Sequence, residues 1–181
     1  MTDSITREII GSEEIDPKFA DKIVKAGADR IRTCIQCGVC SSVCPSGRRT
    51  AFVTRELMRK AILGLKEEVL SNPDLWLCTT CYTCLERCPR QIKTTDAIIY
   101  MRNMAAKEGH MLPEHKRTSE KLLSTGHAVP LDDENQEKRK ELELEEIPPT
   151  VHRDKEALED VKKILEITGF KTLIEGQKAE K

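Results

Sequence analysis

Apolar residues recur at helical spacing in four segments of this 181-residue chain, and charged residues separate them. This pattern predicts a mainly α-helical protein. The first segment starts at Asp16-Pro17, where aspartate is a common N-cap and proline a common first helical residue. An apolar face of Phe19, Ile23 and Val24 follows, and Gly27 is expected to end this short helix.

The longest helical pattern runs from residue 48 to residue 70, with apolar positions near i, i+3, i+4 spacing. The apolar residues are Phe52, Leu57, Met58, Ala61, Ile62, Leu65, Val69 and Leu70. Ser71-Asn72-Pro73 is expected to stop this helix, because the residue before a proline disfavours helical backbone.

Two later segments have the same character. Thr94-Thr95-Asp96 is expected to cap a helix that ends near Gly109. Residues 154–168 predict an amphipathic helix that stops at Gly169. The inward residues are Ala97, Ile98, Met101, Met104 and Ala105 in the first helix and Leu158, Val161, Ile164 and Leu165 in the second. A single appended helix cannot bury its apolar stripe alone, so the second helix is expected to pack on the preceding domain or on a partner.

The pattern divides the chain into four parts. We expect a polar N-terminal segment at 1–15, an α-helical domain at 16–110, a charged connecting segment at 111–149, and a C-terminal amphipathic helix and tail at 150–181. Pro148-Pro149 marks the last boundary.

Composition predicts a small apolar core. Only six residues are aromatic and 34% are charged, against about 25% charged in a typical globular chain. The formal net charge of −1 indicates neither nucleic acid nor an anionic membrane as a partner. No apolar run approaches the roughly 18 residues that a membrane span needs, so we expect a soluble protein. The role predicted below for its cysteines suits a reducing cytoplasm.

Eight cysteines form two copies of one motif, C-x2-C-x2-C-x3-C-P. The first runs from Cys34 to Pro45 and the second from Cys78 to Pro89. This is the bacterial-type run for a [4Fe–4S] cluster, in which the fourth cysteine binds the other cluster of a pair. Proline after the fourth cysteine fixes φ and turns the chain away from its own loop.

The spacing therefore predicts two [4Fe–4S] clusters with crossed ligands. The first cluster is expected on Cys34, Cys37, Cys40 and Cys88, and the second cluster on Cys78, Cys81, Cys84 and Cys44. The motif repeats after 44 residues, which is too long for the compact ferredoxin fold of short strands, so an α-helical ferredoxin domain fits better. Because metal binding then carries much of the folding free energy, the metal-free protein is expected to fold poorly.

Two other roles for the cysteines must be considered. A disulfide framework belongs to short secreted chains, and the start of this chain has no signal-peptide pattern. Four-cysteine zinc sites need only paired C-x2-C units, which leaves the third cysteine of each motif and the repeated Cys-Pro unexplained. Zinc is the stronger of the two alternatives.

Basic residues flank the motifs. An oxidised cluster with four thiolates carries roughly −2, and either these residues offset that charge or they are ordinary surface charges. They are Arg48, Arg49, Arg87, Arg90 and Lys93.

No catalytic residue is predicted. The chain lacks a phosphate-binding glycine loop and a local nucleophile signature. His110, His115, His127 and His152 are scattered and are expected to bind no metal.

The motif segments resemble the iron–sulfur C subunits of heterodisulfide reductase from methanogenic archaea. The similar stretches are Ile-Gln-Cys37-Gly-Val-Cys40 with Cys44-Pro45, Leu-Lys-Glu-Glu-Val-Leu at 65–70, and Trp76-Leu-Cys78-Thr-Thr-Cys81-Tyr-Thr-Cys84-Leu-Glu-Arg-Cys88-Pro89. The resemblance covers about residues 15 to 110. It implies an electron-transfer role through two [4Fe–4S] clusters, without a substrate site in this chain.

The resemblance also implies partners. These are a flavin-bearing A subunit and a cysteine-rich B subunit that reduces the coenzyme M–coenzyme B heterodisulfide, in a bifurcating complex that can include a hydrogenase or formate dehydrogenase. Related proteins that fuse a similar domain to a catalytic cysteine-rich part have a Cys-Cys-Gly pair that this chain lacks. Two alternatives remain: a free-standing ferredoxin that carries electrons by diffusion, and a zinc-held interaction module.

Overall fold

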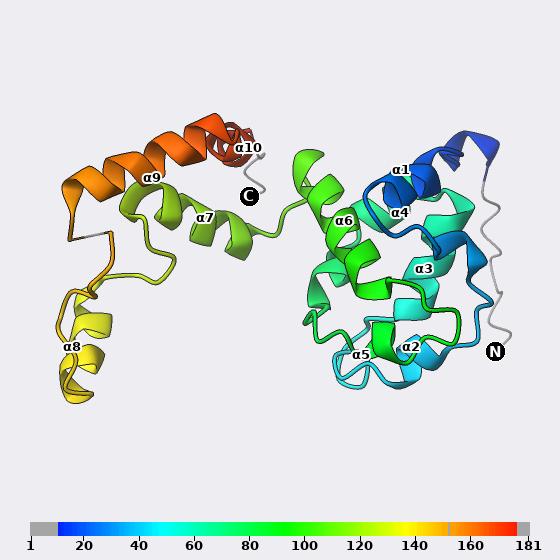
Figure 1. Cartoon of the computed structure of the whole chain (residues 1–181), viewed down its shortest axis with the longest axis horizontal. Helices are drawn as coiled ribbons and strands as arrows, with labels where there is room; N and C mark the ends of the chain where they lie inside the picture. Colours follow the sequence, from blue (N-terminus) through cyan, green and yellow to red (C-terminus); the bar gives the residue numbers. More distant parts are fainter. Residues whose placement is uncertain (1–10, 152, 177–181) are drawn as a thin grey trace, which may run out of the picture. The chain divides into compact units, whose positions relative to one another are not determined.

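The computed structural model describes residues 11–151 and 153–176, and within them the secondary structure is helical with no strand (Figure 1). The prediction of a mainly α-helical protein is confirmed. The chain forms two compact units, one ending at Glu108 and the other starting at Gly109. None of the described helices is long and apolar enough to cross a membrane.

The first unit holds six α-helices within its described residues. They are α1 (Phe19–Lys25), α2 (Val39–Ser42), α3 (Thr54–Leu63), α4 (Lys66–Leu70), α5 (Thr83–Glu86) and α6 (Thr94–Lys107), with 3₁₀ helices at Ser12–Glu14, Ile31–Thr33 and Pro73–Leu77. Residues 1–10 of the predicted polar segment lie outside the described residues.

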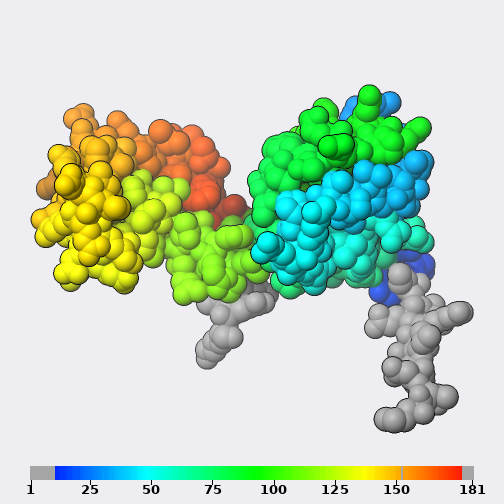
Figure 2. All heavy atoms as spheres, turned by 90° about the horizontal axis from the view of Figure 1, so that it is seen from below, coloured from blue at the N-terminus to red at the C-terminus, as the bar shows by residue number. Residues whose placement is uncertain are grey.

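The core of this unit joins the apolar faces of α1, α3 and α6. Phe19, Ile23, Met58, Ile98 and Met101 are almost completely buried in one cluster, as the helical periodicity predicts. Helix α1 packs against α3 and α6, and α4 packs against the same two helices. In Figure 2 the light-blue and cyan segments of this unit pack against its green segments. The core therefore ties the segment after the first motif to the segment after the second.

The two motifs fold alike. In each, a 3₁₀ helix precedes the first cysteine, and a residue in left-handed backbone starts the short helix that carries the third cysteine. This residue is Gly38 (φ +83°) before α2 and Tyr82 (φ +62°) before α5. Helices α2 and α5 pack against each other (Figure 1). The sequence repeat is thus also a structural repeat.

The expected helix over 48–70 is wrong as one continuous element. Residues 48–53 lie outside any helix, and a break at Gly64 and Leu65 separates α3 from α4. Gly64 adopts φ +83°, its carbonyl accepts a hydrogen bond from Asp16 N at 2.8 Å, and an added Cβ would lie 2.5 Å from Asp16 O. A tertiary contact with the segment before α1 therefore decides where α3 ends.

The expected caps of α1 and α6 are also wrong in detail. Helix α1 begins at Phe19, although Asp16 Oδ1 does accept a hydrogen bond from Lys18 N at 2.9 Å. Helix α6 begins at Thr94 itself and has no side-chain cap at its start. The threonine side chains are buried and bond elsewhere, because this end of α6 lies against the second motif.

The second unit contains α7 (Pro113–Thr125), α8 (Asp133–Glu141), α9 (Lys155–Ile167) and α10 (Phe170–Glu175). The predicted amphipathic helix corresponds to α9, and Asp154 caps it through Oδ1, which accepts hydrogen bonds from Glu156 N and Ala157 N. Helix α9 packs on α7 and α10 of its own unit, an outcome that the sequence pattern did not predict. The segment expected as a charged connection contains both α7 and α8.

Candidate metal centre

Two cavities in the first unit are each lined by four cysteines. Cys34, Cys37 and Cys40 share the first cavity with Cys88. Cys78, Cys81 and Cys84 share the second cavity with Cys44. These are the two groups that the motif spacing predicts as ligand sets. Each cavity takes three cysteines from one motif and the fourth from the other.

The crossing follows from the way the motifs pack. Helix α2 carries Cys40 at the first cavity and ends just before Cys44 at the second, and α5 relates Cys84 and Cys88 in the same way. Two hydrogen bonds hold the ends of the motifs together. Ser46 Oγ donates to Leu77 O at 2.7 Å, and Arg30 Nη1 donates to Gln91 Oε1 at 2.8 Å.

Polar hydrogens are directed at the sulfur atoms. Gly47 N donates to Cys44 Sγ at 3.3 Å, and Ile92 N donates to Cys88 Sγ at 3.4 Å. Thr80 N donates to Cys78 Sγ at 3.4 Å. Hydrogen bonds to sulfur stabilise negative charge on a thiolate and are one of the factors that set the potential of an iron–sulfur cluster.

Burial opposes thiolate formation when no metal is bound. It raises the pKa of Cys40 to about 11, and it also raises the pKa of Cys78 and of Cys84. A hydrogen bond with Thr83 lowers the pKa of the exposed Cys81. The buried thiols are therefore protonated near neutral pH, and a metal that binds them must displace these protons.

Each cavity has one cysteine that faces solvent. Cys37 and Cys81 are exposed and occupy the same position in the two motifs. Two apolar side chains of the same loops are also exposed: Ile35, two residues before Cys37, at 61%, and Tyr82, directly after Cys81, at 44%. A group bound in either cavity would therefore have an edge near the protein surface.

The cavities fit a group larger than a single metal ion. A zinc ion requires its four sulfurs about 2.3 Å from one point. No three His, Cys, Asp or Glu side chains of the described residues are arranged in this way around one metal ion. Four thiols that line one cavity without converging on a single point suit an iron–sulfur cube, in which each thiolate binds a different iron.

The starts of α3 and α6 contribute to the walls of the cavities. Each position in α3 has an equivalent in α6 that is 40 residues later in the sequence. The buried residues Thr54 and Thr94 are the first residues of their helices. Arg55 and Met58 of α3 line the first cavity, whereas Thr95 and Ile98 of α6 line the second. One cavity thus has an arginine where the other has a threonine, whose Oγ1 lies 3.3 Å from Cys84 Sγ.

Most of the flanking basic residues do not line the cavities. All five are exposed, and Arg90 alone among them lines a cysteine cavity. Arg55 and Arg102 lie close to the cysteines, and the sequence pattern did not single them out. For Arg102 a signal existed, because this charged residue falls on the apolar stripe of α6, between Ile98 and Ala105.

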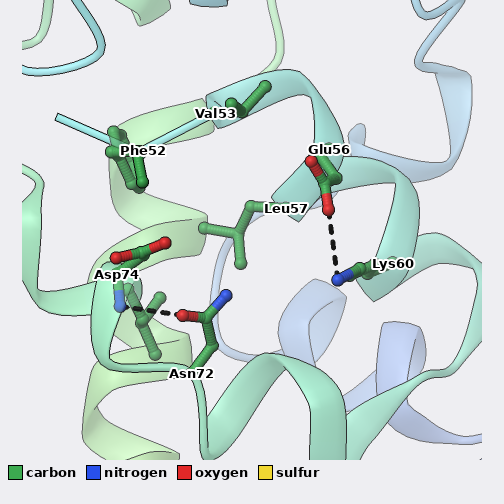
Figure 3. Close-up of a pocket in the computed structure, with 9 residues that line it drawn as sticks. Phe52, Val53, Glu56, Leu57, Lys60, Asn72 and Asp74 are labelled. Atoms are coloured by element: carbon green, nitrogen blue, oxygen red, sulfur yellow. Dashed lines mark hydrogen bonds and ion pairs between the residues drawn. The ribbon is translucent and has the colours of Figure 1, made fainter.

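A third cavity lies away from the cysteines, between the start of α3 and the 3₁₀ helix Pro73–Leu77 (Figure 3). Lys60 forms an ion pair there with Glu56 at 3.1 Å, and Asn72 Oδ1 accepts a hydrogen bond from Asp74 N at 2.8 Å. The space open to water is about 50 Å³, whereas small-molecule sites usually have 300–1,000 Å³. The side chains of Glu56, Lys60 and Asn72 already have partners within the chain.

The histidines lie outside the first unit. His127 Nδ1 is close to the backbone of Val129, at 3.1 Å from its oxygen and 3.2 Å from its nitrogen. His110 and His115 also have partners, and His152 lies outside the described residues.

Comparison with known proteins identifies the family. Residues 30–92 match the model of the 4Fe-4S dicluster domain. The C subunit of the H(2):CoB-CoM heterodisulfide,ferredoxin reductase of Methanothermobacter marburgensis is 51% identical over 166 residues, which cover 92% of this chain and 90% of the relative. The chain belongs to the family of heterodisulfide reductase C subunits.

Two further relatives agree. The iron-sulfur C subunit of the CoB--CoM heterodisulfide reductase of Methanopyrus kandleri is 49% identical over 163 residues, covering 90% of this chain and 83% of the relative. The C subunit of the ferredoxin/F(420)H(2)-dependent CoB-CoM heterodisulfide reductase of Methanosarcina acetivorans is 52% identical over 153 residues, covering 84% and 94%. The expected family and the expected two [4Fe–4S] clusters are confirmed.

Proposed function

We propose that this chain is the electron-transfer subunit of a cytoplasmic heterodisulfide reductase complex. In it, the chain relays electrons between a flavin-bearing A subunit and a catalytic B subunit, which reduces the coenzyme M–coenzyme B heterodisulfide. The observation that supports this proposal most directly is the pair of adjacent cavities, each lined by four cysteines. A bound [4Fe–4S] cluster takes up and releases one electron at a time.

The proposed ligands follow the two cavities. Cys34, Cys37, Cys40 and Cys88 hold the first cluster, and Cys44, Cys78, Cys81 and Cys84 hold the second. The packing of α2 on α5 supports this crossed assignment, because it brings the end of each motif to the other motif's loop. The same packing would keep the two clusters next to each other within the unit.

The exposed cysteines suggest how electrons enter and leave. Cys37 lies at the surface edge of the first cluster and Cys81 at that of the second. Each cluster can then exchange electrons with a different partner while its remaining ligands are sheltered. The chain itself needs no substrate pocket for this task.

The first test is the cluster content of anaerobically purified protein. About eight iron and eight sulfide per chain are expected, with an EPR spectrum of two interacting reduced clusters after dithionite reduction. Stoichiometric zinc without sulfide would contradict the proposal and would favour a zinc-held module.

A second test separates a component of a complex from a free ferredoxin. Native gel filtration of cell extract, followed with an antibody to this chain, should find it in a large assembly with flavin and cysteine-rich subunits. A species of about 20 kDa would contradict the proposed complex and favour a diffusing carrier.

A further inference from the structure

Arg102 is fixed next to the second cavity by three contacts. Its Nε donates to Leu75 O at 3.0 Å, and its Nη2 donates to Cys78 O at 2.7 Å. Its guanidinium carbon lies 5.7 Å from the centre of the Trp76 ring. These contacts hold the guanidinium beside the backbone of a cysteine that lines the cavity.

This guanidinium is half-buried and has no anionic partner within the described part of the chain. Its hydrogen bonds go to neutral carbonyl groups, and the negative group that would act on it is the thiolate form of Cys78. An arginine stays protonated in proteins, and a charge that leaves water normally has a counter-charge. An anionic cluster in the second cavity would supply such a counter-charge.

The first cavity has no equivalent cation. With the 40-residue correspondence of α3 and α6, the residue that matches Arg102 is Ile62, which packs against the apolar core. Arg55 and Arg90 line the first cavity, but both are exposed, so water and salt screen their charges more strongly.

We propose that Arg102 raises the reduction potential of the second cluster, the one held by Cys44, Cys78, Cys81 and Cys84. Uptake of one electron makes a cluster and its thiolates one charge more negative, from roughly −2 to roughly −3. A fixed positive charge beside Cys78 stabilises the reduced form more than the oxidised form. The burial of this charge strengthens its effect, because screening is weaker away from water. The inference rests on the ligand assignment proposed above.

The test is an EPR-monitored redox titration of the full chain with clusters, in the wild type and in Arg102→Gln. Glutamine keeps a polar side chain and removes the charge. One of the two couples should move to lower potential, with about eight iron per chain retained. Arg102→Lys keeps the positive charge, so the potential of this couple should stay close to its wild-type value.

Arg55→Gln is the matched control, because it removes an arginine from the wall of the first cavity. Arg55→Gln should not change the potential of the couple that responds to Arg102→Gln. An Arg102→Gln protein with full iron content and both couples unchanged would overturn the proposal. So would a result in which both variants move the same couple equally.

Arg102→His decides the question if glutamine costs the protein its clusters. Histidine titrates near neutral pH, so its charge can be switched in one folded protein. As the pH rises from about 6 to about 8, the potential of the affected couple should fall by more than in the wild type. An equal dependence of the potential on pH in both proteins would contradict the proposal. Wild-type protein without iron and sulfide would instead contradict the ligand assignment itself.

Discussion

Cys88 ends the second motif, yet its side chain lines the same cavity as Cys34, the first cysteine of the first motif. The reciprocal relation joins Cys44 to Cys78. The two cavities are therefore interlocked, and neither motif lines a four-cysteine cavity without the other.

Replacing Cys88 by Ser should damage the first cluster and spare the second. Iron should fall from about eight toward about four per chain. The remaining EPR signal should match that of Cys37→Ser, a variant that removes a ligand from within the first loop. Cys44→Ser should instead match Cys81→Ser, and the opposite matching would show that each motif holds its own cluster.

Removing the clusters should unfold much of the first unit. Cysteines of both motifs line each cavity, and clusters bound there would join the segments that carry α2 and α5. Chelation of the iron under anaerobic conditions should abolish the sharp thermal transition of that unit, as followed by circular dichroism. A metal-free protein that still melts cooperatively near the temperature of the native protein would contradict this expectation.

Helical periodicity was enough to predict the class of fold, because the buried faces of α1, α3 and α6 are decided mainly by local apolar spacing. It could not predict the end of α3, which depends on the contact between Gly64 and the backbone of Asp16. Helix α7 was missed because no residue in it is buried and its sequence is largely polar.

The candidate site could likewise be predicted only in part from the sequence. Cysteine spacing and the following prolines predict the two ligand groups, because a loop that binds a [4Fe–4S] cluster needs its cysteines at fixed positions in the sequence. The roles of Thr95 and Arg102 depend on which face of α6 meets the second motif. Thr95 looked like a helix cap, but its hydroxyl faces Cys84 Sγ instead.

Thr95→Val should lower the potential of the second cluster. The hydroxyl lies 3.3 Å from Cys84 Sγ, and a hydrogen bond to a thiolate favours the more negative, reduced form. Thr94→Val is the control: it removes a similarly buried hydroxyl that donates to Ile92 O at 3.2 Å. Both variants should lose about 1 kcal/mol of unfolding free energy, but only Thr95→Val should move that couple in a redox titration. Equal shifts in both would mean that the hydroxyl of Thr95 has no particular effect on the cluster.

Gly64→Ala should destabilise the first unit more than Gly109→Ala does. Both glycines have a left-handed backbone, with φ of +83° and +92°, but a Cβ at position 64 would lie 2.5 Å from Asp16 O. At position 109 nothing lies within 4 Å, so alanine there has only the backbone cost of about 1 kcal/mol. We expect a loss of about 2–3 kcal/mol for Gly64→Ala, measured by chemical unfolding of the cluster-loaded protein. Similar losses in both variants would show that the Asp16 segment moves aside at little cost.

Tyr82 occupies the position that Gly38 has in the other motif, and both residues adopt left-handed backbone. For a bulky residue this conformation costs about 1–2 kcal/mol, whereas glycine adopts it freely but loses more entropy on folding. Tyr82→Gly should therefore leave the unfolding free energy unchanged or raise it by up to about 1 kcal/mol. Gly38→Ala, which meets no atom closer than Arg55 Cδ at 3.7 Å, should lower it by about 1 kcal/mol.

A clear loss of stability in Tyr82→Gly would mean that the tyrosine ring makes contacts that offset its backbone strain. The expected result would instead indicate a functional role for Tyr82, because a strained residue that does not stabilise the protein is typical of functional sites. Tyr82 is 44% exposed and follows the exposed Cys81, at the surface edge of the second cavity. Electron transfer from the chain to its partner should then slow in Tyr82→Gly, although the cluster content stays at the wild-type value and the unfolding free energy does not fall. Stopped-flow measurement with the purified partner protein can show this.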